Sequence, residues 1–352
     1  MKDTRRTFLR KASAALGATA FGPNIWIKKA RAANKEIVLG HQSHRYRVIE
    51  GWGIPDGAKH PVNDCHEMVA DARGRLLMLT NEIKNNVLVY DRSGKVLNAW
   101  GTSYPGAHGL SLSTEGTEQF LYITDTDRNL VIKTDLNGKE ILTLDYPREA
   151  GEYESHGSYK PTETAINPAN GDIYVADGYG KNFIIQYDST GKYIRHFGGT
   201  GDTAGTFRCC HGIAVDVRHP MNPTLLITDR SHMCFKRFTL QGEYLERIEL
   251  PGSFICRPVI QGEHVYAAVY RSGSESRANS GYITILDRNN RVISTPGGSA
   301  PEYSANSLQQ QTKDFSFSGF RHPHDVCIDN DESIYVPQWA SGKTYPVKLE
   351  RI

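Results

Sequence analysis

The sequence predicts an all-β fold, a six-bladed β-propeller, from three observations. A strand-and-turn pattern recurs along the chain, and the two ends of the chain carry complementary parts of that pattern. The 352 residues are 39% hydrophobic and 23% charged, and the 33 glycines and 18 tyrosines suit strands joined by turns. A β-sandwich or a pair of domains would also be all-β, but neither predicts a counted repeat that closes into a ring.

The repeat has a constant order of features. A polar residue leads an alternating apolar strand, a second strand ends at a corner such as "ITD" or "VAD", and a "GK" or "GE" turn joins the third strand to the fourth. Short strands separated by turns in this way are typical of antiparallel sheet. Four regular copies and then two irregular ones begin at Cys65, Ala107, Pro161, Cys210, Cys256 and Pro323.

The two ends of the chain complete the ring. The last copy contains only three strands, whereas residues 44–53, "HRYRVIEGWG", are similar to the fourth strands "GKVLNAWG" and "GKYIRHFGG" of other copies. An N-terminal strand that closes the last blade removes the exposed sheet edges. We therefore expect a single propeller domain over residues 34–352.

Residues 1–33 have the pattern of a twin-arginine (Tat) signal peptide. "TRRTFLRK" carries the paired arginines, the apolar stretch "ASAALGATAF" follows, and a small-residue cleavage site lies after Ala32. The apolar stretch is too short to cross a membrane and remain there. We expect cleavage, export through the Tat translocon, and a periplasmic or extracellular location without a membrane span.

The net charge limits the kinds of molecule that the chain could bind. A formal net charge of +2 provides no strong basic excess to meet phosphates, so we expect no nucleic acid. A small molecule, a peptide or a carbohydrate remains as substrate, and we expect a monomer.

The six cysteines should be mostly free and buried, although one disulfide pair among them stays an open alternative. The polar segment 295–318 fits either a lid over one mouth of the ring or a surface excursion.

The residues that open the six repeats carry the candidate chemistry. The first strand of each blade lines the channel, so its opening residue lies on a shared ring near one mouth. One such histidine alone would usually be a polar strand cap, but four of the six openings are histidine. Imidazoles that converge on one axis suit Zn²⁺ or another divalent transition metal. The openings are His66-Glu67, His108-Gly109, Thr162-Glu163, His211-Gly212, Arg257-Pro258 and His324-Asp325.

The motifs around three of these histidines are similar to those of a known family. "AHGLS" at His108, "CHGIA" at His211 and "HPHDV" at His324 are similar to its "PHGLS", "PHSLA" and "MPHDI". From about residue 64 onward, the chain resembles the lyase domain of peptidylglycine α-amidating monooxygenase, a six-bladed NHL-type propeller. The resemblance implies that these three histidines hold a catalytic zinc ion. His66 has no counterpart in the family and is a possible extra ligand.

The resemblance also implies roles at two strand-end corners and at a second ion. "ADGY" is similar to the family's "SDGY" and gives Tyr179 as a catalytic residue, whereas "TDR" is similar to its "ADR" and gives Arg230. Asp325, with the backbone carbonyls of Leu110 and Met68, would hold a structural calcium ion. Without the resemblance, Tyr179 and Arg230 would be interpreted as ordinary strand-end packing.

Other positions depart from the family and predict a changed substrate wall. Its first-blade arginine falls here at Asn81 or Glu82, and the methionine before its third metal histidine is His322. The amidation substrate carries a carboxylate, which Arg257 or Arg208 could bind in place of the lost arginine. The residues that we expect to bind substrate are Arg257, Glu163, Glu67, His322 and Asn81.

These residues predict an exported, metal-dependent, lyase-like enzyme that performs an elimination or a hydrolysis at a hydroxylated carbon. It would be a carbon–nitrogen or carbon–oxygen lyase. The ion would act as a Lewis acid. Tyr179, deprotonated or nearly so beside the metal and Arg230, would be the general base, and Arg230 would stabilise developing charge. Glu67 and Glu163 could instead orient the metal ligands.

Two alternatives remain open at this point. One is a non-catalytic NHL propeller that serves as a binding platform around a structural channel ion, because a fold does not determine a function. The other is a Ca²⁺-dependent, lactonase-type propeller. Its ring of carboxylates and asparagine could be formed by Glu67, Glu163, Asp325 and Asn81.

Overall fold

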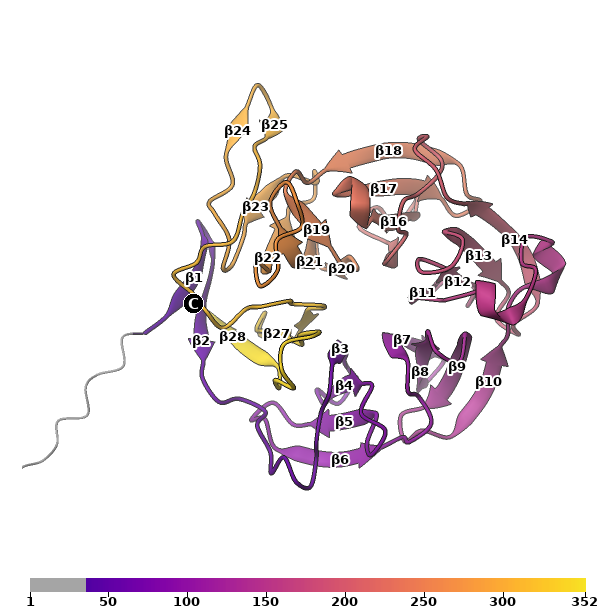
Figure 1. Cartoon of the computed structure of the whole chain (residues 1–352), viewed down its shortest axis with the longest axis horizontal. Helices are drawn as coiled ribbons and strands as arrows, with labels where there is room; N and C mark the ends of the chain where they lie inside the picture. Colours follow the sequence, from indigo (N-terminus) through magenta and orange to yellow (C-terminus); the bar gives the residue numbers. More distant parts are fainter. Residues whose placement is uncertain (1–35) are drawn as a thin grey trace, which may run out of the picture. The chain divides into compact units, whose positions relative to one another are not determined.

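Six antiparallel sheets surround a central axis in the computed structural model, which describes residues 36–352 (Figure 1). The all-β, six-bladed propeller is confirmed. Helix in this part of the chain is limited to the 3-10 turns η1 (Arg148–Ala150), η2 (His156–Ser158) and η3 (Arg230–His232). No helix within residues 36–352 is long and apolar enough to cross a bilayer. The predicted signal peptide, residues 1–33, lies outside the described residues.

The four regular repeats form four sheets in which the first strand lies nearest the axis and the fourth lies at the rim (Figure 1). Blade 1 contains β3 (Cys65–Ala70), β4 (Leu76–Thr80), β5 (Val87–Tyr90) and β6 (Val96–Trp100). Blade 2 contains β7 (Ala107–Glu115), β8 (Glu118–Asp125), β9 (Leu130–Asp135) and β10 (Glu140–Leu144). Blade 3 contains β11 (Glu163–Ile166), β12 (Ile173–Ala176), β13 (Phe183–Tyr187) and β14 (Tyr193–Gly198). Blade 4 contains β15 (Ile213–Asp216), β16 (Thr224–Asp229), β17 (Cys234–Thr239) and β18 (Tyr244–Glu249).

The fifth and sixth sheets are less regular, as the sequence predicts. Blade 5 contains β19 (Ser253–Ile255), β20 (Val259–Gln261), β21 (His264–Ser272), β22 (Tyr282–Leu286) and β23 (Val292–Ser294). Both β19 and β20 pair with β21, and the chain between them contains Pro258, which has no N–H to donate to the ladder. Blade 6 contains β26 (Cys327–Ile328), β27 (Ile334–Val336) and β28 (Val347–Arg351).

The N-terminal strand closes blade 6. β2 (His44–Ile49) pairs with β28, with Tyr46 opposite Arg351 and Ile49 opposite Lys348. The closure is therefore consistent with the expectation from the sequence. β1 (Val38–His41) then pairs with β2 and adds a fifth strand to this sheet, which the repeat did not predict.

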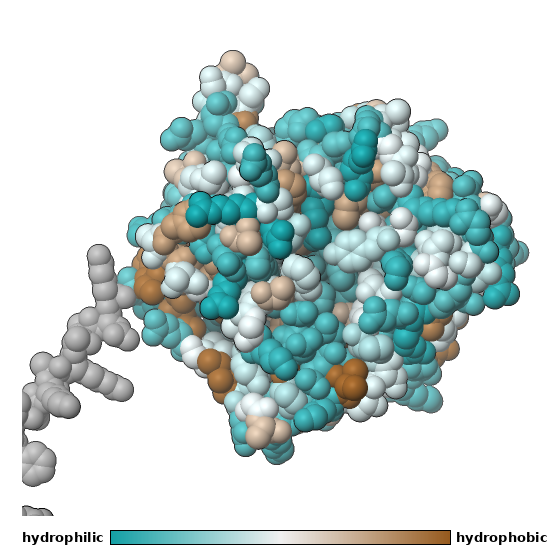
Figure 2. All heavy atoms as spheres, in the orientation of Figure 1, coloured by the Kyte–Doolittle hydropathy of each residue, from teal (hydrophilic) through white to brown (hydrophobic). Residues whose placement is uncertain are grey.

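The long segment after β23 forms a small hairpin, β24 (Tyr303–Ser304) with β25 (Ser307–Leu308). Figure 1 shows this hairpin projecting outward from the rim, away from the axis. The structure therefore favours the surface excursion over the lid. Figure 2 shows hydrophilic residues over most of one face, where apolar residues form scattered spots.

The core lies between neighbouring blades. Every residue of β4 and β5 is buried, whereas β6 at the rim is half-buried or exposed. Leu77 and Val89 of blade 1 pack with Leu110 and Ile123 of blade 2 in one apolar cluster. Burial of apolar surface on both faces of the inner sheet stabilises the ring and fixes where each first strand begins.

Glycines let the first strands approach one another closely at the axis. A Cβ atom added to Gly109 would lie 2.6 Å from the carbonyl oxygen of Thr162, and one added to Gly212 would lie 2.3 Å from the Cα of Arg257. Both contacts are with backbone, which cannot move aside without shifting a strand. The residue that follows His108 in blade 2, and the one that follows His211 in blade 4, must therefore be glycine.

We predict that Gly109→Ala and Gly212→Ala each lower the free energy of unfolding by about 1–3 kcal/mol, because overpacking at the axis forces strands apart. Chemical unfolding followed by tryptophan fluorescence measures the change. Gly205→Ala is the matched control, since no neighbouring heavy atom lies within 4 Å of its added Cβ. Equal stability of all three variants would contradict the close approach.

Candidate active site

Four histidines from four blades gather at one mouth of the channel. His66 lies in β3, His108 in β7, and His211 and His324 just before β15 and β26. All four are buried. Ring centroids are 4.9 Å apart for His66 and His108, 4.8 Å for His108 and His211, and 5.0 Å for His211 and His324. The predicted convergence is present, and the metal-binding role remains a prediction.

Backbone contacts set the tautomer of two of these rings. Nδ1 of His108 lies 2.9 Å from the carbonyl oxygen of Thr162, and Nδ1 of His324 lies 3.2 Å from that of His66. A carbonyl oxygen can only accept, so each Nδ1 carries the hydrogen and each Nε2 keeps a free lone pair. Burial lowers the pKa of His66 to about 3 and the pKa values of His108 and His324 well below their usual range. Neutral imidazole is the form that binds a metal.

The spacing of the donor atoms suits a small divalent ion. Nε2 of His108 and Nε2 of His211 are 3.2 Å apart. Two ligands at about 2.0–2.1 Å from a tetrahedral Zn²⁺ lie about 3.4 Å apart, so this pair fits such an ion. Two sets of three residues place donor atoms within 4.8 Å of one another: His66 with His108 and His324, and His211 with Cys256 and His324. Neither set is the trio that the resemblance implies, but both contain His324.

Cys256 is a candidate ligand that the sequence analysis missed, because the register of the fifth repeat is shifted by one residue. The N–H of Cys256 donates to the carbonyl oxygen of Ala268 in the neighbouring strand. In blade 3, the N–H of Thr162 donates to the carbonyl oxygen of Ala176 in the same way. Cys256 therefore stands at the level of Thr162 and the histidines, and Arg257 stands one residue deeper in the channel. The prediction that Arg257 opens the fifth blade on the histidine ring was wrong.

Tyr179 stands at the edge of the histidine cluster. Its hydroxyl lies 3.2 Å from Nε2 of His108, 3.1 Å from Nε2 of His211 and 3.3 Å from Nη1 of Arg230. The side chain is also 43% exposed, so a substrate can reach it from the mouth. The corner that precedes it is rigid, because Asp177 accepts hydrogen bonds from the Tyr153 hydroxyl and from the N–H groups of Lys160 and Lys181.

Without a bound ion, the surroundings of Tyr179 favour its protonated form. Burial of its hydroxyl raises the pKa of Tyr179 to about 12, and Arg230 opposes this shift without overcoming it. In the chain alone, Tyr179 is therefore protonated at neutral pH, and its role as a base beside a metal stays a prediction. Acting as a base requires a further positive charge beside the hydroxyl.

Arg230 is held at the second strand-end corner. Nε donates to the carbonyl oxygen of Ile255 at 3.0 Å, and Nη2 donates to Sγ of Cys256 at 3.1 Å. Its guanidinium carbon lies 4.5 Å from the ring centroid of Tyr270. These contacts leave Nη1 directed at Tyr179, which is the orientation that its predicted role needs.

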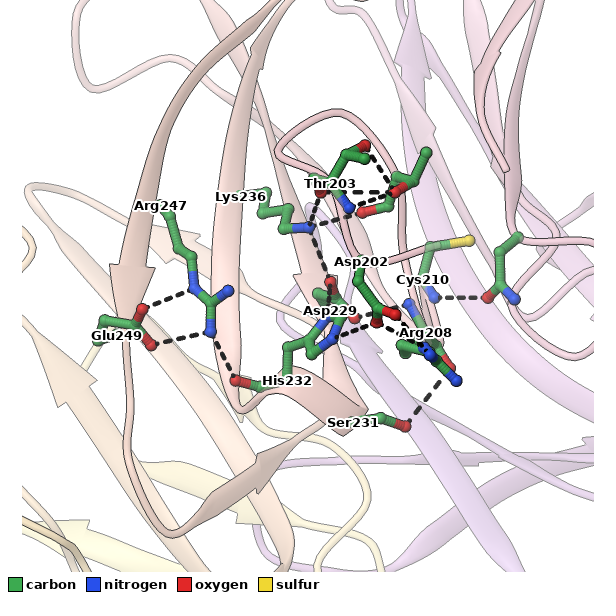
Figure 3. A network of polar contacts seen from close by, with 12 residues as sticks. Asp202, Thr203, Arg208, Cys210, Asp229, Ser231, His232, Lys236, Arg247 and Glu249 are labelled. Carbon is green, nitrogen blue, oxygen red and sulfur yellow. Dashed lines mark hydrogen bonds and ion pairs between the residues drawn. The ribbon is translucent and has the colours of Figure 1, made fainter. Parts of the chain in front are cut away.

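A network behind Arg230 fixes the corner (Figure 3). Asp229 accepts a hydrogen bond from the N–H of Arg208 at 3.0 Å, contacts Nδ1 of His232 at 2.7 Å and pairs with Lys236 at 3.0 Å. Arg208 itself pairs with Asp202 on the exposed surface, at 2.5 Å. Arg208 therefore belongs to the support of this corner rather than to the residues that bind substrate.

Two residues predicted to bind substrate have other contacts. Oδ1 of Asn81 accepts hydrogen bonds from Nδ2 of Asn63 and from the N–H of Asp64, so its side chain holds the loop before β3. Nε2 of His322 accepts from the N–H of Asn279 at 3.0 Å, and its ring centroid lies 6.0 Å from that of Trp339. Asn81 is thus structural, whereas His322 stands against an aromatic residue.

An aromatic wall flanks Arg230 and was not anticipated from the sequence. Tyr270 lies under the guanidinium, and its ring centroid is 6.4 Å from that of Trp339, which in turn contacts His322. Tyr270 comes from the long strand β21 and Trp339 from the segment after β27. Tyr270 and Trp339 occupy different positions within their repeats. Aligning the repeats with one another therefore could not have identified them as neighbours.

The predicted calcium site is occupied by Arg257. Its guanidinium donates to both carboxylate oxygens of Asp325 at 2.8 Å, to the carbonyl oxygen of Leu110 at 2.8 Å and to that of Met68 at 3.1 Å. These are the oxygens that the sequence analysis assigned to Ca²⁺. They do not fit a calcium ion while the guanidinium is bound to them. Arg257 is buried and fully engaged, so it is not a substrate-binding residue.

Glu67 and Glu163 lie beside this arginine. Oε2 of Glu67 is 3.3 Å from Nη1 of Arg257 and accepts the N–H of Leu110 at 2.6 Å, whereas Oε2 of Glu163 is 3.7 Å from the same Nη1. Burial raises the pKa values of both carboxyls, and Arg257 opposes the shift. Both residues therefore belong to the buried support of the histidines rather than to the substrate wall. The carboxylates that a lactonase-type calcium site would need thus surround the guanidinium of Arg257 instead.

Comparison with known proteins supports the fold and relates the chain to a group of enzymes. A family profile described as a 6-bladed beta-propeller matches residues 163–315. Peptidylglycine alpha-amidating monooxygenase of Rattus norvegicus is 27% identical over 261 residues, which cover 72% of this chain and 24% of that protein. A probable peptidyl-alpha-hydroxyglycine alpha-amidating lyase of Caenorhabditis elegans is 22% identical over 272 residues, which cover 75% of this chain and 70% of that protein.

The chain is a six-bladed β-propeller that resembles the amidating lyases. It spans about a quarter of the length of the first curated relatives that it matches. Among solved structures, a gluconolactonase of Xanthomonas campestris has a TM-score of 0.58 at 9% identity and covers 90% of this chain and 95% of that one. Virginiamycin B lyase of Staphylococcus aureus has a TM-score of 0.52 at 13% identity, with 88% of each chain covered. At such low identity these likenesses show the fold alone.

The six cysteines all lie in the described part of the chain and are free thiols, five of them buried. The expectation of mostly free, buried cysteines is therefore met, and the structure contains no disulfide between them. Cys65, Cys210 and Cys327 fill the core, and Cys256 is the one that stands among the candidate metal ligands.

We predict that His108→Ala and His211→Ala each weaken the binding of Zn²⁺ by at least about 10–100-fold, the range already seen when outer-shell partners are lost. Competition with a chromophoric chelator measures the affinity. His219→Ala is the matched control, because His219 is exposed and lies outside the cluster. An H211A chain that binds zinc as tightly as the control would contradict the assignment.

Proposed function

We propose that this chain is a metal-dependent lyase that breaks a carbon–nitrogen bond at a hydroxylated carbon. One observation carries the proposal: the Tyr179 hydroxyl lies 3.2 Å and 3.1 Å from Nε2 of His108 and His211 and 3.3 Å from Nη1 of Arg230. A hydroxyl, a cation and the donor atoms for a divalent ion thus meet at one point, on a tyrosine whose side chain is partly exposed at the mouth. The resemblance to enzymes named for amidating-lyase activity supports this reaction class.

The proposed substrate is a peptide or a smaller amide that ends in α-hydroxyglycine, or a related carbinolamine. In such a group, one carbon carries a hydroxyl and an amide nitrogen. Removal of the hydroxyl proton lets the oxygen form a carbonyl while the C–N bond breaks. Its electron pair goes to the nitrogen, which takes up a proton, so the products are glyoxylate and an amide.

The residues of this chain divide the work of that reaction. Tyr179 accepts the hydroxyl proton, because its oxygen lies between the candidate metal ligands and Arg230. Arg230 stays charged and stabilises the negative charge that develops on the substrate oxygen. His108, His211 and His324 would hold a divalent ion, with His66 and Cys256 as further candidates; such an ion would polarise the substrate hydroxyl and lower the pKa of Tyr179.

The substrate carboxylate has a different partner from the one expected. Arg257 is engaged inside the channel, whereas Arg230 lies beside Tyr179, so Arg230 is the cation proposed to meet the substrate carboxylate. The aromatic wall of Tyr270 and Trp339 beside it would accept an apolar group of the substrate. The same proposal places the enzyme outside the cytoplasm, because the twin-arginine pattern of residues 1–33 is an export signal.

We predict that Tyr179→Phe lowers kcat for an N-acyl-α-hydroxyglycine by about 10²–10⁴-fold, the contribution typical of a positioned acid or base. Glyoxylate release by the purified, zinc-loaded chain measures the rate. Tyr244→Phe is the matched control, because Tyr244 lies in the rim strand β18, away from the cluster.

A Tyr179→Phe chain that releases glyoxylate as fast as the wild-type chain would exclude Tyr179 as the base. A wild-type chain that binds zinc at the histidines but turns over neither this substrate nor a carbinolamine would support the binding-platform alternative instead.

A further inference from the structure

We infer that the guanidinium of Arg257 is the permanent structural cation of the channel and that the wild-type chain has no calcium site at the axis. Arg257 lies between β19 and β20 and is buried, with its side chain 9% exposed. The inference is independent of the proposed lyase activity, because no step of that reaction uses Arg257.

The contacts of this one side chain reach across the ring. Nε and Nη2 donate to the two carboxylate oxygens of Asp325, at 2.8 Å each, in blade 6. Nη2 also donates to the carbonyl oxygen of Met68 in blade 1 at 3.1 Å, and Nη1 donates to that of Leu110 in blade 2 at 2.8 Å. A planar guanidinium can make this set of contacts because its five N–H groups point outward in a fixed fork.

The two remaining blades also meet this residue. Oε2 of Glu163 in blade 3 lies 3.7 Å from Nη1. Just before β15 of blade 4, the backbone at Gly212 approaches so closely that an added Cβ would lie 2.3 Å from the Cα of Arg257. Together with its own blade, Arg257 therefore contacts or closely approaches all six.

The charges around Arg257 explain why a cation is needed there. Asp325, Glu67 and Glu163 are fully buried, and three carboxyl groups near one another on an axis repel when ionised. Oε1 of Glu67 and Oε2 of Glu163 are buried without a hydrogen-bond partner among the described residues. A cation at the centre lowers the electrostatic repulsion among these carboxyl groups. Here that cation is a side chain of the protein, Arg257, rather than a bound ion.

The oxygens held by Arg257 are the kind that calcium prefers. Carboxylates and backbone carbonyls are hard oxygen ligands, and Ca²⁺ accepts six to eight of them in flexible geometry. A chain that lacks the guanidinium would keep Asp325, Glu67, Glu163 and two carbonyls around the same point. It should therefore gain a calcium dependence that the wild-type chain does not have.

The position of Arg257 also separates two parts of the channel. The histidines lie on one side of it. His66 and His324 directly precede Glu67 and Asp325, the acids that contact Arg257. On the other side is a cavity of about 390 Å³, lined by residues that include Met68, Ser111, Thr164 and Val326 as well as Arg257 itself. The arginine thus forms the floor beneath the histidine cluster.

Thermal unfolding of the full chain in Ca²⁺ and in EGTA tests the inference. We expect the Tm of the wild-type chain to be the same in both. Arg257→Ala should have a Tm lower by more than about 4 °C in EGTA, the shift that a loss of about 3 kcal/mol gives in a chain of this size. Added Ca²⁺ should recover part of that loss. Arg288→Ala is the matched control, because Arg288 forms only an exposed pair with Glu263.

Direct titration of the wild-type chain with Ca²⁺ provides the second measurement and does not depend on the variant folding. Absence of stoichiometric binding supports the inference, and one tightly bound calcium per chain overturns it. Equal Tm values for R257A and R288A would overturn it as well. A further variant, Arg257→Lys, should also be destabilised, because a point charge cannot bind both Asp325 oxygens and two carbonyls together.

Discussion

The ion pair between Arg257 and Asp325 is the interaction on which the site depends. In a propeller, six inner strands converge, so any polar side chain that they direct inward must be satisfied by another inner strand. Breaking a buried pair by removing one partner costs several kcal/mol, because it leaves a charge without compensation. Asp325 follows His324 and Glu67 follows His66 in the chain, so anchoring the acids also fixes the histidines above them.

Two further anchors hold the chemistry at the mouth. Asp177 ties down the corner that carries Tyr179, and Asp229 ties down the corner that carries Arg230. Both aspartates end or follow the second strand of their blades, so the same repeat that builds the sheets places a base and a cation side by side. The channel thus has three layers: an ion-paired floor, a ring of neutral imidazoles, and a reactive rim.

The sequence alone predicted the features that follow from the repeat. Strand order, ring closure by β2 and the convergence of His66, His108, His211 and His324 all depend on spacing, which a single sequence displays. The level of Arg257 was not predictable in the same way, because the pairing of β19 with β21 is irregular between Phe254 and Ile255. The contacts of Arg257 with Met68 and Leu110 cross the axis, and such contacts leave no periodic pattern in the sequence. The wall of Tyr270 and Trp339 leaves none either, because the two residues come from unrelated positions of the repeat.

We propose that the histidine cluster holds a divalent ion directly above the guanidinium of Arg257. A crystal of the full chain grown with Zn²⁺ and measured at the zinc absorption edge tests it most directly. We expect one anomalous peak, about 2.0–2.1 Å from Nε2 of His108 and His211 and from a nitrogen of His324, with Arg257 still bound to Asp325. An anomalous map without a peak among the four histidines, or with an ion between Asp325 and the Met68 and Leu110 carbonyls, would contradict it.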